Sequence, residues 1–201
     1  PPGPSPHSPD PIQKKTIIID AGHGGRDSGS RGGGSVFEKS ITLTMAKRLA
    51  HKLNATGQYI CILTRSRDEG MTLAQRLRTV RNANGDLFLS IHADSCSHPD
   101  TRGLSIYTLS QVASDREAAR LAQKENKADL NLGIDFKNEL PEISDILIDL
   151  TKRETMNLST KIAKELLKEL SRNVFLLRRP HRFADFVVLR SPHVPSILIE
   201  L

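Results

Sequence analysis

The chain is poor in aromatic residues and in cysteine. Its 201 residues include six Phe, two Tyr and no Trp, which is poor material for a surface that stacks on sugars or on single-stranded bases. The two cysteines, Cys61 and Cys96, are too few for a disulfide framework and lack the spacing of a metal site. We expect both to be buried free thiols, with one disulfide between them as the alternative.

Long apolar runs are also missing. No run of about 18 apolar residues occurs, so we expect no membrane span. The start shows no signal-peptide pattern, and residue 1 is a proline, so we expect a fragment of a longer protein. The formal charge of +6 indicates either an anionic partner or a soluble domain with scattered lysines, and both remain open. We expect a monomer.

Proline is concentrated at the start of the chain. Six of the eleven prolines fall within residues 1–15. Such a stretch favours extended, unpacked backbone, so we predict a proline-rich linker or tail there. Residues 16–201 then have the length and apolar content of a single domain.

Strands and helices alternate along this domain. Apolar runs predict strands at 16–19, 58–64, 86–91, 103–109, 183–189 and 196–201, and amphipathic patterns predict helices at 38–54, 72–84, 114–126 and 155–172. The order predicts an α/β domain with a mostly parallel, twisted sheet and helices on both of its faces. In the first helix the apolar positions recur every fourth residue, at Ile41, Met45, Leu49 and Leu53. A capping box from Ser114 to Glu117 is expected to begin the third helix.

Three polar side chains stand where three predicted strands end. His23 follows the run containing TIIID, His92 follows DLFLSI and Glu200 follows SILI. Sites in open α/β sheets form outside the carboxyl ends of the strands, so we expect these side chains to converge. Glu38, in the first turn of its helix, adds a carboxylate to the two imidazoles. Two histidines and a glutamate are the ligand set of a catalytic zinc that keeps one position open.

The position of Glu200 after a buried run needs an explanation. A carboxylate there costs several kcal/mol unless it is paired, hydrogen-bonded or neutralised. A general base beside a metal ion explains it, and a buried salt bridge to an arginine is the alternative. Asp20 is placed to orient the imidazole of His23, and we interpret the surrounding glycines as letting the backbone pass close to a ligand or metal. The pattern predicts a zinc hydrolase.

At these residues the chain resembles the zinc-dependent N-acetylmuramoyl-L-alanine amidases of the amidase-3 type. The matching segments are IIIDAGHGGRDSG, the glutamate of FEKSITL, TRSRD, LSIHAD and PSILIEL, in the order of the family. The resemblance implies hydrolysis of the amide between N-acetylmuramic acid and L-alanine in peptidoglycan, for wall remodelling and daughter-cell separation in the periplasm. It also implies Zn²⁺ on His23, Glu38 and His92, with Glu200 as the catalytic glutamate.

An insertion at about residues 125–154 differs from the rest of the chain. Residues 125–150 hold seven acidic side chains and two lysines. The KENKAD motif at 124–129 resembles the cell-division amidases of Gram-negative bacteria, in which an inserted helix covers the site until a partner moves it. The resemblance implies that Glu125 fills the open position of the metal, with Glu139 and Glu142 as substitutes, and that a protein activator displaces the insertion. An ordinary packed helix with a solvated acidic face is the alternative.

Other functions remain open. One alternative is an inactive wall-binding or regulatory module that kept the fold, and another is a different zinc peptidase with a His2Glu site. A nucleic-acid binder would rest on charge alone, because no recognition-helix or aromatic pattern supports it. We therefore expect peptidoglycan and a protein activator as partners, and no nucleic acid. Residues that bind the substrate are not identified, although Arg26 is a candidate for holding stem-peptide carboxylates.

Overall fold

A computed structural model describes residues 13–95, 102–132 and 146–201. In this part of the chain the strands are β1 (Lys15–Ala21), β2 (Tyr59–Leu63), β3 (Leu87–His92), β4 (Leu104–Leu109), β5 (Leu176–Ala184) and β6 (Ser196–Glu200). The helices are α1 (Glu38–Ala55), α2 (Leu73–Asn82), α3 (Arg116–Glu125), α4 (Ala128–Asn131) and α5 (Ile146–Leu170), with short 3-10 turns η1 (Gly33–Ser35) and η2 (Val187–Leu189).

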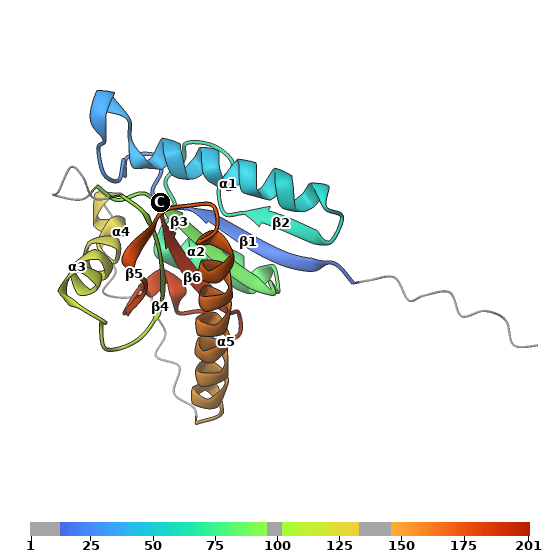
Figure 1. Ribbon diagram of the computed structural model, residues 1–201. Coiled ribbons are helices and arrows are strands. Elements are labelled where there is room, and N and C mark those ends of the chain that lie inside the picture. The colour runs from blue at the N-terminus through green and yellow to red at the C-terminus, as the bar shows by residue number, and fades with distance from the viewer. Residues whose placement is uncertain (1–12, 96–101, 133–145) are drawn as a thin grey trace, which may run out of the picture.

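The six strands form one sheet in the order β2-β1-β3-β6-β4-β5. All neighbours are parallel except β4 and β6, which run antiparallel. The predicted fold class, a mostly parallel sheet flanked by helices, is therefore confirmed. Because β1, β3 and β6 are parallel neighbours, their carboxyl ends meet at one edge of the sheet (Figure 1), where the register sets His92 beside Glu200.

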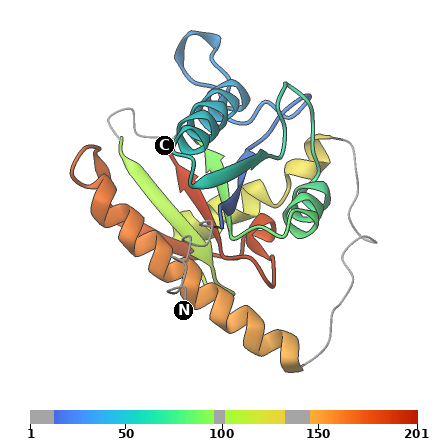
Figure 2. The same ribbon diagram turned by 90° about the vertical axis from the view of Figure 1, so that its right-hand side faces the viewer.

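Helices cover both faces of the sheet (Figure 2). Strand β1 shows why the sheet is apolar on both sides: Ile17 and Ile19 pack with α1 and α5, whereas Ile18 between them packs with α2 and α3. Successive side chains of a strand point to opposite faces, so a strand covered on both faces reads as a continuous apolar run. This arrangement explains why the central strands were recognisable in the sequence.

The buried face of α1 differs from the expected one. Ile41 and Met45 are each 37% exposed, and the fully or nearly fully buried positions are one residue further along, at Glu38, Thr42, Ala46 and Ala50. Small side chains let the helix axis approach the sheet closely, while Leu49 and Leu53 pack at the margin of the contact. The apolar spacing identified the helix but misplaced its buried stripe by one position.

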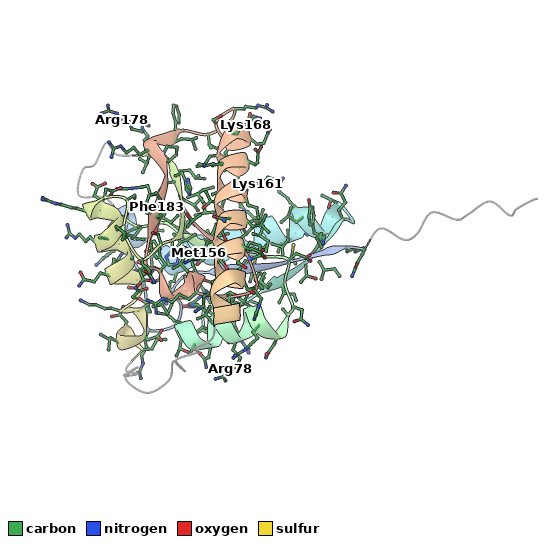
Figure 3. The ribbon with its side chains drawn as sticks, turned by 90° about the horizontal axis from the view of Figure 1, so that it is seen from below. Arg78, Met156, Lys161, Lys168, Arg178 and Phe183 are labelled. Carbon is green, nitrogen blue, oxygen red and sulfur yellow. The ribbon has the colours of Figure 1, made fainter. Side chains whose placement is uncertain are left out.

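Helix α5 repeats this pattern and begins earlier than predicted, at residue 146 rather than 155. Its apolar Leu158 is 46% exposed, and the buried positions are Ser159, Ala163 and Leu167. Basic side chains occupy its outer surface, including Lys161 and Lys168 (Figure 3). None of the helices among the described residues is long and apolar enough to cross a membrane.

Two local predictions were wrong. The strand expected at 183–189 lies earlier, as β5, and residues 187–189 form the turn η2. Helix α3 is capped by Asp115, whose carboxylate accepts from the Ala118 N–H, and not by Ser114. Glu117 consequently pairs with Arg182 instead of closing a capping box. Of the two cysteines, Cys61 is half-buried on β2, and Cys96 lies outside the described residues.

Candidate active site

The structure brings Glu38, His23 and His92 together at the carboxyl edge of the sheet. Glu38 Oε1 lies 3.0 Å from His23 Nε2 and 3.3 Å from His92 Nδ1. Backbone N–H groups fix the carboxylate, since Ala93 donates to Oε1 at 2.9 Å and Ser30 to Oε2 at 2.8 Å. All three functional side chains are buried. Their elements are α1 for Glu38, the loop after β1 for His23 and the end of β3 for His92.

Glycines make room for the two imidazoles. A Cβ on Gly22 would lie 2.5 Å from His92 Nε2, and one on Gly29 would lie 2.6 Å from His23 Cδ2. His23 itself has a φ of 61°, in the left-handed region that non-glycine residues seldom occupy. The interpretation of the glycines as permitting close approach therefore holds at Gly22 and Gly29.

Asp27, and not Asp20, orients the imidazole of His23. Its Oδ2 lies 2.8 Å from His23 Nδ1, so the ring donates there and turns Nε2 toward Glu38. Asp20 instead forms a buried ion pair with Arg76 and accepts hydrogen bonds from Thr64 and Ser90. Arg76 holds the pKa of Asp20 below its usual range even though burial by itself raises it.

Arg76 also fixes the backbone of the loop that carries His23. Its guanidinium donates to the carbonyl oxygens of Ala21 at 2.9 Å and His23 at 2.9 Å. Arg65, which is 1% exposed, adds hydrogen bonds to the carbonyls of Ala21 and Gly22. Two buried arginines thus satisfy backbone acceptors that the turn around His23 leaves without strand partners.

Glu200 lies at the same edge as these residues. Its Oε2 accepts from the Asp94 N–H at 2.9 Å, and its buried Oε1 has no hydrogen-bond partner among the described residues. No ion pair between Glu200 and an arginine is found in the described part of the chain, so the salt-bridge alternative has no support there. Burial raises the pKa of Glu200 to about 8.

Glu125, the last residue of α3, reaches the histidines from a helix on the face of the sheet that α1 does not cover. Its Oε2 lies 3.5 Å from His23 Nε2 and 3.3 Å from His92 Nδ1, and its side chain is buried. The substitutes considered from the sequence, Glu139 and Glu142, lie outside the described residues. A cavity of about 320 Å³ adjoins this point and is lined by residues that include His23, Arg26, Lys124 and Glu125.

The electrostatics of the cluster fit a bound cation. His23 Nε2 and His92 Nδ1 are buried without a hydrogen-bond partner among the described residues, and carboxylates face both atoms. Burial alone lowers the pKa of an imidazole, yet Asp27 and Glu38 raise that of His23 to about 10, and Glu125 and Glu38 raise that of His92. The two histidines hold the pKa of Glu38 well below its usual range, against the effect of burial.

The donor set agrees with that interpretation. His23, His92 and Glu125 each offer one ligand atom, and these atoms lie within 4.8 Å of one another. Nitrogen and carboxylate oxygen ligands suit zinc and related divalent ions. Buried imidazoles and carboxylates at the carboxyl edge of an α/β sheet, beside a glutamate with a raised pKa, are compatible with a metal centre of the kind that hydrolases use.

Comparison with known proteins specifies the family. Residues 17–201 match the family model described as N-acetylmuramoyl-L-alanine amidase, and the chain belongs to this family of hydrolases. The resemblance drawn from the sequence motifs is thereby confirmed at the level of the family.

Individual relatives agree with this assignment. The chain is 35% identical to N-acetylmuramoyl-L-alanine amidase AmiC of Neisseria meningitidis serogroup B over 94% of this chain and 45% of that protein. It is also 35% identical to AmiA of Escherichia coli K12, over 93% of this chain and 65% of that protein. The solved structure of AmiC2 of Nostoc punctiforme is similar with a TM-score of 0.59 at 28% identity, over 94% of this chain and 80% of that one. The chain thus spans between about half and two thirds of these two curated relatives.

Several residues that shape the site were missed in the sequence. Asp27 was overlooked because Asp20, at the end of a strand, matched the expected pattern better; its position four residues after His23 was the available signal. Asp94 carries no signal of its role, because it holds Glu200 through its backbone N–H, which almost any residue could supply. The roles of the buried arginines Arg65 and Arg76 could not be predicted, although Arg65 lies in the TRSRD segment, because their main partners are distant in the sequence.

Proposed function

We propose that this chain hydrolyses the amide bond between N-acetylmuramic acid and L-alanine in peptidoglycan, with Zn²⁺ bound by His23, His92 and Glu38. The observation that carries the proposal is the convergence of His23 Nε2 and His92 Nδ1 on Glu38 Oε1, within 3.3 Å. Family membership supports the substrate and the bond. We further propose, from the similarity to AmiA and AmiC, that the activity serves wall remodelling and daughter-cell separation in the periplasm.

In the proposed reaction the zinc ligands and Glu200 have different roles. A bound zinc ion supplies Lewis-acid chemistry, which makes water more acidic and an amide carbonyl more electrophilic. Glu200 takes the proton of the attacking water and delivers it to the leaving alanine nitrogen. Burial raises the pKa of Glu200 in the metal-free site, which makes its carboxylate a stronger base than that of an exposed glutamate. The Asp94 N–H, bonded to Oε2, leaves Oε1 for the proton.

We also propose that the site is autoinhibited by Glu125. Its Oε2 lies within 3.5 Å of His23 Nε2 and His92 Nδ1, the two nitrogens that would hold the ion, so the carboxylate would fill the position that water and substrate need. A protein activator would then be needed to withdraw α3 and α4. Arg26 is exposed, lines the adjoining cavity and is our candidate for binding stem-peptide carboxylates.

Dye release from purified peptidoglycan sacculi tests the chemistry. Because Glu200 is the proposed base, we expect Glu200→Gln to lower the rate by at least about a hundredfold while zinc binding is retained. Chelation should abolish the residual activity of the unaltered protein, and added Zn²⁺ should restore it. Glu169→Gln is the matched control, since Glu169 is an exposed acid on α5 that pairs with Arg172. An unchanged rate for Glu200→Gln would contradict the proposal.

Mass spectrometry of the products separates the alternatives. An amidase frees whole stem peptides that begin with L-alanine and leaves the glycan intact. Cleavage within the stem peptide would indicate a different zinc peptidase. Glu125→Ala is included in the same assay, because removal of the inhibitory carboxylate should accelerate the release. A protein that binds sacculi but releases no product, even with Glu125 replaced, would be an inactive wall-binding module.

A further inference from the structure

Polar side chains on both sides of Glu125, between Lys124 and Asp129, attach this segment to the rest of the domain. Lys124 donates to Asp94 at 2.6 Å and to Ser30 at 2.8 Å. Asn126 donates to the Asp185 carbonyl at 2.7 Å and accepts from the Val187 N–H at 2.8 Å. Leu130, an apolar residue of α4, is 57% exposed. Ala118 and Ala122 of α3 pack on the apolar core, whereas the exposed Leu130 adds little apolar burial in α4.

Asp129 makes the most buried of these attachments. Its side chain is completely inaccessible, and its two carboxylate oxygens accept from the Leu73 N–H at 3.0 and 3.1 Å. Leu73 is the first residue of α2, where the helix dipole favours a negative charge. A carboxylate bonded to an N–H at this position forms a charge-assisted hydrogen bond, which is stronger than a neutral one.

Helix α2 leaves this N–H available for Asp129. Its own capping box pairs the Thr72 hydroxyl with the Gln75 N–H and the Gln75 side chain with the Thr72 N–H. The N–H groups of the first turn have no partner within the helix, and the capping box does not use that of Leu73. Asp129 meets this requirement from 56 residues away in the sequence.

Asp129 and Glu125 are four residues apart and both are buried. One carboxylate is bonded to the start of α2 and the other lies between His23 and His92. Withdrawal of Glu125 by movement of this segment would expose the Asp129 carboxylate and the Leu73 N–H together. The attachment at α2 is thus coupled to the occupation of the site.

We propose that Asp129 is the positioning residue that keeps Glu125 between the histidines, and that its bond to the N-terminus of α2 sets how readily the site opens. The inference rests on the proposed inhibitory role of Glu125. It assigns the activator a specific task, which is to break the contact between α4 and α2. A role confined to capping α2 would lower stability without raising activity.

The rate of dye release from sacculi, measured without any other protein, tests the assignment. Loss of a charged hydrogen bond shifts an opening equilibrium by about tenfold or more, so Asp129→Ala should raise the basal rate by about that factor. Asp129→Asn, which keeps an acceptor without the charge, should give a smaller rise. Hydrogen exchange of the Leu73 amide should accelerate in both variants. Asp86→Ala is the matched control, because Asp86 accepts from the Thr16 N–H at 2.8 Å away from the site.

Combining Asp129→Ala with Glu125→Ala separates action through Glu125 from a purely structural role of Asp129. If Asp129 acts through Glu125, then adding Asp129→Ala to Glu125→Ala should give no further acceleration. If Glu125→Ala raises the rate of dye release but neither Asp129→Ala nor Asp129→Asn does, the proposed role of Asp129 would be wrong. Autoinhibition by Glu125 would still be supported. If none of these variants releases dye faster than the unaltered protein, both autoinhibition by Glu125 and the positioning role of Asp129 would be wrong. If Asp129→Ala fails to fold, Asp129→Asn and the Leu73 exchange rate decide.

Discussion

The ring of His92 lies where a side chain at residue 22 would be, so its position requires glycine there. A Cβ there would lie 2.5 Å from both Cε1 and Nε2 of the imidazole. We predict that Gly22→Ala displaces His92 and weakens zinc binding by about 10- to 100-fold, the range typical when the support of a ligand is disturbed. Competition with a chromogenic chelator measures this. Gly33→Ala is the control, because no atom lies within 4 Å of a Cβ at that position, and equal affinities for the two variants would contradict the account.

Glu200 should make the metal-free protein less stable as the pH rises. Burial raises its pKa in the folded state to about 8 from the ordinary value of 4.5, so folding takes up a proton between those values. Stability therefore falls as pH increases from about 5 to about 8. Glu200→Gln should remove this part of the slope and unfold at higher urea concentration than the unaltered protein at pH 8 in a chelator. Parallel pH profiles for the two proteins would refute the prediction.

At the residue scale, the sequence was informative where chemistry follows directly from a strand end. His23, His92 and Glu200 stand at such ends, and the structure brings them to one edge with Glu38; their roles as ligands and base remain predictions. The prediction of Asp20 as the orienting carboxylate was wrong, because the path of the glycine-rich loop brings Asp27 to His23 instead. The arginine beside Asp20 comes from α2, far along the chain.

At the scale of elements, the helices were easier to locate than to orient. In α1 the largest apolar side chains are not the most buried, and Ala46 and Ala50 contact the sheet instead. Hydrophobic spacing predicts which side of a helix is apolar, whereas the closest contact depends on which small residues let the helix approach the sheet. The sequence therefore predicted the existence of α1 and α5 and missed the buried positions of α1 by one residue.

This difference can be measured by substitution in α1. Ala46 is completely buried against the sheet, so Ala46→Leu should overpack the interface and reduce the free energy of unfolding by about 1–3 kcal/mol. Met45→Ala removes more atoms but should cost less, because Met45 is 37% exposed. Urea denaturation compares them. A larger loss of unfolding free energy for Met45→Ala than for Ala46→Leu would mean that Met45 faces the core, as the sequence pattern predicted.

At the scale of the whole molecule, the site is a meeting point of distant segments. The loop after β1, the start of α1, the end of β3, the end of α3 and the end of β6 each contribute one side chain (Figure 1). A parallel sheet makes this possible, since the ends of its strands share an edge. The fold class and the family were predictable from the sequence, whereas the contacts of α4 were not, because Asp129 and Leu73 become neighbours only through the tertiary structure.

The central claim is that one divalent cation is held between two imidazoles and the Glu38 carboxylate. The most direct test is an anomalous-difference map, collected at the zinc edge, from crystals of the full chain grown with zinc. We predict one strong peak within about 2.0–2.2 Å of His23 Nε2, His92 Nδ1 and a Glu38 oxygen. A map with no peak there, or with zinc bound only by other residues, would contradict the account.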